Sequence, residues 1–516
     1  MTPPNATRNL TLGPQCWACR ERRVRCGSET PGCLKCAVKG VDCPGYGHTR
    51  PLRWRKPQSP RKFSKNQTGE GSLTKVCPVV LSPKSLQLEH EILYFNERVA
   101  PDLVVMDSSS NPFRYPLKLS AQTPAYFNYI YASISTCHRI IQRYYGNMHM
   151  YRTQSTGMTV STKSTPSLTG PDEAALYHYR ASALKGLNEA LSKATRSPPN
   201  IDILGGVMLI LHSQLQQAAY GQWRIHLDGF KKLIEFYGGC EHLLKDDIPA
   251  SIILANVLII DVMSNTTTPV HFMTQGTLRW HSAYLGILPR MDHDLVPTPT
   301  PIPLHVLKAV TMVNIVRARS HQTRSELGRY PNFTFSLVLA ELGISLETGK
   351  TVEWLGGSSA NYDGTNVQTP DHVLFADSYQ SAVIIYATEA YMLISENSLH
   401  EVANTIRDSA YTSLMTALRV LFELKDKTQS GEAYWKFIFW PLAIAGVQSV
   451  VARHHRGDFE YICTKLYEMT AALGSHCMRD AAIFLEHLWM ETSDSGADGH
   501  PLTWDEIFKD APLFLL

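Results

Sequence analysis

The 516-residue chain lacks any long apolar run, and its first residues contain no apolar stretch at all. A secretory leader needs an apolar core of about 7 to 15 residues, so the opening MTPPNATRNLTLGP favours a cytosolic or nuclear address. The most apolar segments, residues 252–263 and 437–456, fall short of the roughly 20 residues that span a bilayer, and Pro441 and Gln448 interrupt the second. We expect two buried core helices in a soluble protein without a membrane partner.

Catalytic signatures are also missing. The chain has no HExxH, GxSxG or GxGxxG motif, so we expect no enzyme. The stretch GISLETGKT, residues 343–351, resembles a phosphate-binding loop, but five residues instead of four separate its glycines, which indicates a chance match. His454 and His455 are interpreted as a polar cluster at a helix end. A metabolic enzyme is therefore only a minor alternative.

Cysteine is sparse except in one place. Six of the 11 cysteines lie within 28 residues and repeat the spacing C-x2-C-x6-C twice. Disulfides need an oxidising compartment, whereas C-x2-C thiols suit zinc, so the pattern favours metal. Six sulfurs fill all eight ligand positions of two tetrahedral zinc ions when two sulfurs bridge. The predicted ligands of this two-zinc cluster are Cys16, Cys19, Cys26, Cys33, Cys36 and Cys43. The other cysteines, expected to be small buried side chains, are Cys77, Cys137, Cys240, Cys463 and Cys477.

This segment resembles the Zn2Cys6 binuclear cluster of fungal transcription factors, whose six cysteines have the same spacing. The resemblance implies that Cys16 and Cys33 bridge the metals. It also implies a proline, here Pro31, that often follows a cis peptide bond. Four residues depart from the usual pattern. Arg23 and Arg25 stand where lysine is common, Glu21 lies inside the basic run, and Gly27 stands where aspartate is usual.

The same resemblance implies DNA binding. Such modules place a short helix in the major groove, and the run RERRVR, residues 20–25, is the cationic stretch tied to the metal. Arg22 and especially Arg23 are expected to contact bases, because arginine can make a two-bond contact with guanine in a CGG-like triplet. The cations expected mostly at phosphates are Arg20, Arg25, Lys35 and Lys39.

Positive charge is concentrated at the N-terminus. Residues 1–65 contain 14 Lys and Arg against 3 Asp and Glu, whereas the whole chain has a net charge of only +3. A basic head on a mildly acidic body is typical of an appended nucleic-acid-binding module. We predict a disordered tail (1–15), the cluster domain (16–43) and a basic, proline-rich linker (44–80). The linker shows no heptad pattern, so a homodimer would form without an evident coiled coil.

Residues 81–516 are predicted to form one all-α domain. Apolar residues recur at intervals of three and four in the stripe Leu176, Tyr179, Ala183, Leu184, Leu187, Ala190, Leu191 and Ala194. Similar stripes occupy residues 88–103, 221–239 and 410–426. The body also resembles the all-helical regulatory domain of one large subgroup of Zn2Cys6 factors. The similar segments, in chain order, are residues 43–54, 111–135, 222–239, 439–449 and 502–516.

The C-terminal segment WDEIFKDAPLFLL, residues 504–516, interleaves apolar and acidic side chains. This composition suits an acidic activation segment that folds onto a coactivator. It suits equally a closing helix that packs on the body, and we favour packing.

The sequence therefore predicts a nuclear, zinc-dependent, fungal transcription factor of the RNA polymerase II type. We expect it to activate one metabolic gene set, such as a set for a secondary metabolite. Its expected partners are double-stranded DNA with CGG-like half-sites and coactivators or other transcription machinery. The alternative from another class is a metal-dependent module that docks a protein or RNA partner on a helical scaffold.

Overall fold

The computed structural model forms two compact units, Met1–Val79 and Val80–Leu516. It describes residues 15–46, 83–117, 122–152, 170–194, 201–220, 223–244, 248–290, 301–322, 331–342, 370–394, 400–425, 433–452, 456–494, 502–509 and 513. Most of the expected tail and linker lies outside these residues. So do Cys77, the stretch that resembles a phosphate-binding loop, and the pair His454 and His455.

The first unit is built from two short helices, α1 (Trp17–Glu21) and α2 (Leu34–Val38). Helices of five residues are unstable by themselves, because the cost of nucleation exceeds the gain from so few hydrogen bonds. The buried side chains of this unit are thiols: Cys16, Cys19, Cys33 and Cys36 have no exposed surface. A unit with so small an apolar interior needs a cross-link or a metal to remain folded.

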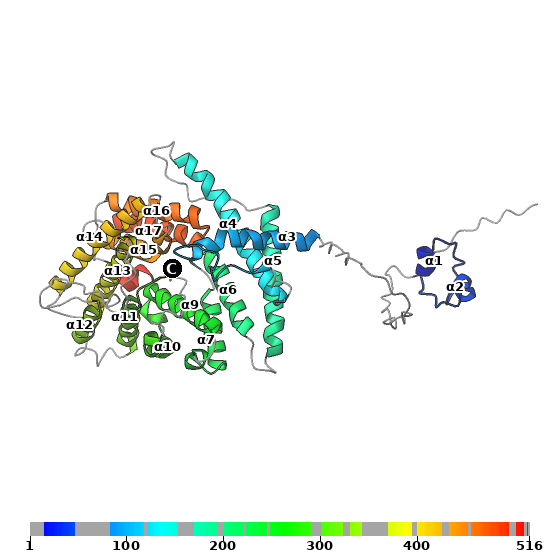
Figure 1. Ribbon diagram of the computed structural model, residues 1–516, viewed down its shortest axis with the longest axis horizontal. Helices are drawn as coiled ribbons and strands as arrows, with labels where there is room; N and C mark the ends of the chain where they lie inside the picture. The colour runs from blue at the N-terminus through cyan, green and yellow to red at the C-terminus, as the bar shows by residue number, and fades with distance from the viewer. Residues whose placement is uncertain are drawn as a thin grey trace, which may run out of the picture. The chain divides into compact units, whose positions relative to one another are not determined.

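The second unit is helical, without a strand in any part that the structure describes, and the predicted all-α class is confirmed (Figure 1). Its α-helices are α3 (Pro83–Tyr94), α4 (Ala125–Arg152), α5 (Pro171–Ala194), α6 (Ile201–Gln217), α7 (Trp223–Phe236), α8 (Cys240–Leu243), α9 (Ile248–Ser264), α10 (Gln275–Ile287), α11 (Leu304–Gln322), α12 (Pro331–Glu341), α13 (Pro370–Ile394), α14 (His400–Leu424), α15 (Phe439–Val451), α16 (Arg456–Leu473), α17 (His476–Asp494) and α18 (Trp504–Ile507). Its shorter turns are η1 (Phe95–Val99), η2 (Ala100–Leu103), η4 (Asn265–Thr267), η5 (Val270–Phe272), η6 (Leu288–Arg290) and η8 (Tyr434–Phe437).

The stripe predicted on α5 is confirmed with one correction. Leu176, Tyr179, Ala183 and Leu187 are buried, and α5 packs along α4. Leu184 was wrongly placed in this stripe, since 45% of its surface is exposed. Successive residues are about 100° apart around the helix axis, so Leu184 lies off the buried face that Ala183 occupies.

Two of the other predicted stripes are confirmed as α7 and α14, and the third is shorter than expected. The stripe at 88–103 runs along α3 only to Tyr94, where a π-helical turn and then a 3-10 turn follow. Pro101 lies in that last turn, and proline has no N–H to continue an α-helix. Helix α7 ends at Phe236, and the chain then passes through Gly238 and Gly239, whose φ angles of 96° and 87° favour glycine.

Both apolar segments are core helices, as predicted. Among the described residues, one window, Ala250–Thr267, is long and apolar enough to cross a membrane, but 89% of it is buried inside the body. Helix α15 is buried along almost its whole length, from Phe439 to Val450. Apolar composition here reflects the centre of a large helical core.

A buried hydrogen-bond hub joins the C-terminal helix to this core. The side chain of Arg317, on α11, is only 2% exposed, and its Nη2 lies 2.5 Å from Oδ1 of Asp505. Its Nη1 donates to the Tyr386 hydroxyl at 2.9 Å and to the Thr266 carbonyl at 3.2 Å. Trp504 Nε1 donates to the same carbonyl at 2.7 Å. Residues from α11, α13, α18 and the turn η4 therefore meet around one cation.

The C-terminal segment is packed, as the sequence analysis favoured. Trp504, Phe508 and Leu513 are each 1% exposed. Phe508 stacks on Phe484 of α17 with ring centroids 5.4 Å apart. Within the described part of this segment, residues 502–509 and 513, the apolar side chains that would contact a coactivator are thus already buried in the body.

Replacement of Trp504 by alanine tests this packing. We expect Trp504→Ala to lower the free energy of unfolding by about 3 to 5 kcal/mol, because a large buried aromatic side chain and its hydrogen bond are lost. Guanidinium unfolding followed by circular dichroism measures the change in the full-length protein. The control, Lys509→Ala, alters an exposed side chain and should stay within about 0.5 kcal/mol of the parent. Equal midpoints for the two variants would contradict the packing.

Candidate metal centre and nucleic-acid interface

The two halves of the cysteine motif start in the same way. Cys16 is the N-cap of α1, and its Sγ accepts a hydrogen bond from the Cys19 N–H at 3.4 Å. Cys33 is the N-cap of α2, and its Sγ accepts one from the Cys36 N–H at 3.4 Å. Each of these thiols therefore takes the capping role that serine or aspartate usually has. The duplication seen in the spacing is also a structural repeat.

The two halves also end in the same way. Arg22 caps the C-terminus of α1, and Lys39 occupies the equivalent position after α2. The next residue is left-handed in both halves, with φ of 54° at Arg23 and 62° at Gly40. One half thus has glycine at a position where φ is positive, whereas the other has arginine.

The six sulfurs form two groups of four, and every pair of sulfurs within a group lies within 4.8 Å. The groups share two sulfurs, those of Cys16 and Cys33. The first group is Cys16, Cys19, Cys26 and Cys33, and the second is Cys16, Cys33, Cys36 and Cys43.

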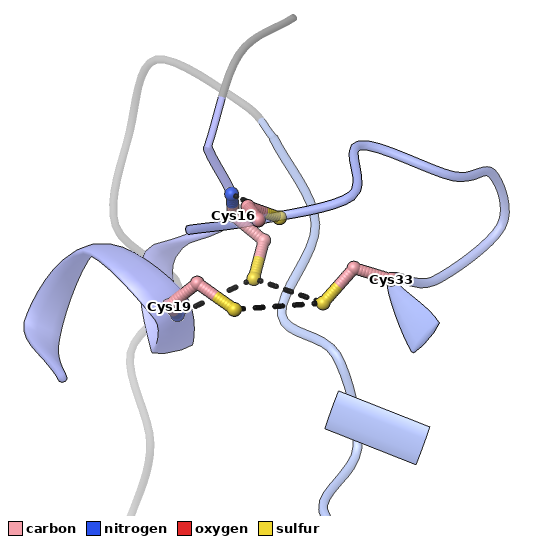
Figure 2. A group of neighbouring side chains, drawn as sticks. Cys16, Cys19 and Cys33 are labelled. Carbon is pink, nitrogen blue, oxygen red and sulfur yellow. Dashed lines mark hydrogen bonds between the residues drawn. The ribbon is translucent and has the colours of Figure 1, made fainter. Parts of the chain in front are cut away.

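The sulfur spacing fits tetrahedral zinc. A Zn–S bond of about 2.3 Å places two sulfurs of one tetrahedron about 3.8 Å apart. The Sγ of Cys33 lies 3.6 Å from the Sγ atoms of both Cys16 and Cys19 (Figure 2). The Sγ atoms of Cys16 and Cys36 are 3.8 Å apart. The donor set consists of soft thiolates at the separation that zinc requires.

Ionisation of the shared thiols is costly without a cation between them. Burial raises the pKa of Cys33 to about 12 and that of Cys16 well above its ordinary range. Burial also raises the pKa of Cys26, but backbone N–H groups of Cys16 and Ser28 more than offset this and lower it to about 7. A divalent cation supplies the charge that lets buried thiols act as thiolates.

The loop between the halves has one feature that the resemblance implied and two contacts that the sequence did not predict. The peptide bond between Thr30 and Pro31 is cis, in line with the resemblance. The Glu29 carboxylate accepts a hydrogen bond from the Leu34 N–H, at the start of α2, at 3.0 Å. The Tyr46 hydroxyl donates to the Glu29 carbonyl at 2.7 Å. The only signal in the sequence is an acidic residue shortly before a helix start, which is too common to single out Glu29.

Space for the Glu29 carboxylate depends on Gly27. A Cβ at position 27 would lie 2.0 Å from one carboxylate oxygen of Glu29. A larger residue here would therefore have to shift the end of the exposed, flexible Glu29 side chain.

All six predicted DNA-contacting side chains are exposed on the first unit: Arg20, Arg22, Arg23, Arg25, Lys35 and Lys39. Helix α1 ends at Glu21, so most of the run 20–25 follows the helix and does not extend it. The guanidinium of Arg20 lies over the Trp17 ring, 5.0 Å from its centroid. Arg22 differs from the other five cations because its guanidinium faces the cluster, where its Nη2 donates to the Cys36 Sγ at 3.4 Å.

The cysteines of the second unit are buried, as predicted, in the part that the structure describes: Cys137, Cys240, Cys463 and Cys477. Burial raises the pKa of Cys137 to about 12 and that of Cys240 to about 11. The buried thiols of Cys137 and Cys240 therefore stay protonated at neutral pH. In the described residues of this unit, no group of three or more potential ligands comes together as the cluster cysteines do.

Comparison with known proteins adds two family matches. The family described as fungal specific transcription factor domain matches residues 91–516. The family described as fungal Zn(2)-Cys(6) binuclear cluster domain matches residues 15–52. No solved structure matches the chain.

Two curated proteins are similar in sequence. The first is the phomenoic acid biosynthesis cluster-specific transcriptional regulator of Leptosphaeria maculans, which is 23% identical over 509 residues, 96% of this chain and 87% of that protein. The second is the acriflavine sensitivity control protein acr-2 of Neurospora crassa, which is 44% identical over 45 residues, 9% of this chain and 7% of that protein. The first similarity thus extends over both units.

The shared sulfurs lead to a test by zinc counting. In Cys16→Ala each group of four loses a ligand, whereas in Cys43→Ala the first group stays complete. We therefore expect Cys16→Ala to lose both ions and Cys43→Ala to retain about one. Zinc per full-length chain, measured after brief dialysis against a weak chelator, separates the two variants. Cys463→Ala, a buried thiol of the second unit, is the control and should keep both ions. Identical losses in Cys16→Ala and Cys43→Ala would contradict the sharing.

Proposed function

Because this chain belongs to the fungal Zn2Cys6 transcription factors and carries their fungal-specific domain, we propose that it is a nuclear, sequence-specific activator of RNA polymerase II genes that reads CGG-like triplets. The cluster domain binds two zinc ions, and members of this family bind DNA. Its families are families of transcription factors, which are generally not enzymes.

The proposed zinc ligands are the six clustered cysteines, with Cys16 and Cys33 as the bridges. Support comes from the two groups of sulfurs, which share those two residues. Two Zn²⁺ and six thiolates carry a net charge of −2, and the exposed arginines of the run 20–25 partly offset it. Metal binding would supply much of the folding free energy of this coreless unit.

The observation that carries the proposed base contact is the backbone conformation of Arg23. A left-handed conformation costs a residue with a Cβ about 1 to 2 kcal/mol, and the matching position of the other half has Gly40. A strained arginine where glycine would be relaxed indicates a use for its side chain. That side chain is exposed, and a guanidinium can donate to O6 and N7 of guanine together. We assign base selection to Arg23.

The other exposed cations suit the DNA backbone. Arg20, Arg25, Lys35 and Lys39 would contact phosphates, which position the protein without selecting a sequence. Such contacts make binding weaker as salt rises, because each neutralised phosphate releases counterions.

The pathway assignment rests on the relative from Leptosphaeria maculans, whose name says that it regulates one biosynthetic cluster. Its similarity covers 96% of this chain, so the helical body is included. We extend this role to our protein as pathway-specific activation of a metabolic gene set, such as one for a secondary metabolite. The body would regulate that activity and contact coactivators.

The decisive experiment is selection from a randomised DNA duplex library by the full-length zinc protein at stated salt. We expect enrichment of CGG-like triplets that disappears when a chelator removes the zinc. The number and spacing of the triplets would also show whether one copy or a homodimer binds. Zinc binding without sequence enrichment would instead favour the docking of a protein or RNA partner.

Paired variants test the role of Arg23. We expect Arg23→Gly to keep both zinc ions and thermal stability, because glycine suits the left-handed backbone, and to lose about 1 to 3 kcal/mol of discrimination at one base pair. Arg25→Ala should weaken binding to selected and random duplexes equally and reduce the salt slope by about 1. Fluorescence anisotropy at several salt concentrations measures both effects. Equal loss of discrimination in the two variants would count against the assignment.

A further inference from the structure

The side chain of Arg22 is held at two points. Its Nε donates to the Ala18 carbonyl at 3.0 Å, within the last turn of α1. Its Nη2 donates to the Cys36 Sγ at 3.4 Å. Both bonds use the edge of the guanidinium that Nε and Nη2 form. This edge is one of the two that can donate a pair of hydrogen bonds to a guanine. Reading a base with this edge would require both bonds to break.

The bond to Cys36 crosses the internal repeat. Arg22 belongs to the first half of the motif, whereas Cys36 is a ligand candidate of the second half and lies in only one of the two sulfur groups. The shared sulfurs already join the halves, and this hydrogen bond adds a connection outside them. A cation that donates to a thiolate forms a charge-assisted bond and draws negative charge from the sulfur.

The equivalent residue of the second half does not repeat this contact. Lys39 caps α2 as Arg22 caps α1, but its side chain makes no hydrogen bond to a cluster sulfur among the residues described. Nor does any other lysine or arginine side chain in the described part of this unit. The repeat is therefore asymmetric. Among the cluster sulfurs, that of Cys36 is the one that accepts a hydrogen bond from an arginine in the described part of this unit.

We propose that Arg22 is a positioning residue for the zinc cluster and does not select bases. It orients Cys36, reduces the reactivity of that sulfur and locks the two halves together. The position of Arg22 in the run 20–25 predicted a base contact, whereas this geometry assigns base selection to Arg23 without Arg22. The proposal rests on the proposed function only in requiring the two zinc ions.

Zinc-release kinetics test this role in the full-length protein. A chelating dye should take zinc from Arg22→Ala about 10- to 100-fold faster than from the parent, the usual effect of losing a hydrogen-bond partner of a metal ligand. Arg22→Lys should be intermediate, because one ammonium nitrogen cannot reach both acceptors as the fork does. Arg25→Ala is the control for charge: it removes a neighbouring exposed arginine that has no bond to a cluster sulfur in the described structure, and its release rate should be unchanged.

Cadmium substitution provides a spectroscopic readout. In the protein loaded with ¹¹³Cd, Arg22→Ala should shift mainly one of two resonances, because Cys36 belongs to one sulfur group only. Arg25→Ala should shift neither. Equal movement of both resonances in Arg22→Ala would indicate a general loss of structure and overturn the proposal.

DNA selectivity separates the two candidate roles of Arg22. The ratio of affinities for selected and random duplexes should be the same in Arg22→Lys as in the parent, whereas it should fall in Arg23→Gly. An equal fall in Arg22→Lys, or unchanged zinc release in Arg22→Ala, overturns the proposal. If the parent protein selects no sequence, the proposed function fails, and the zinc-release and cadmium measurements still decide the role of Arg22.

Discussion

The N-terminal unit depends on one constraint, the sharing of two sulfurs between two groups of four. Six thiols offer eight ligand positions only when Cys16 and Cys33 each serve both groups. The same two residues cap the two helices, so the cluster also fixes where each helix starts. The cluster therefore also positions the proposed DNA contacts. The basic run begins directly after Cys19, and Lys35 and Lys39 lie on and just after the helix that Cys33 caps.

The cluster was predictable from sequence because its spacing is local and repeated. Cysteines at intervals of two and six residues need no tertiary information to be paired with zinc. The bond between Arg22 and Cys36 was not predictable, because it crosses the repeat and depends on how the two helices face each other. The left-handed backbone at Arg23 was equally hidden, since arginine carries no sign of positive φ as glycine does at Gly40.

In the helical body, too, some features could be predicted from the sequence and others could not. Apolar stripes predicted α5, α7 and α14, because the residues on the buried face of a helix are apolar and recur with the helical period of 3.6 residues. They did not predict a buried arginine at position 317, since hydropathy places arginine at the surface. Its burial requires Asp505, which lies 188 residues further along the chain and approaches Arg317 only in the folded body.

The position of that ion pair bears on how the protein would activate transcription. An activation surface built from residues 504–513 would require Trp504 to leave the core and Arg317 to lose its carboxylate. The Asp505 side chain is 25% exposed, but the Arg317 guanidinium that it would leave behind is buried. An uncompensated buried charge costs about 3 kcal/mol or more, which would leave fewer than one molecule in a hundred open. A coactivator would have to supply that free energy before gaining any from binding. The proposed activating contacts are therefore better placed on surfaces of the body that are exposed in the folded state.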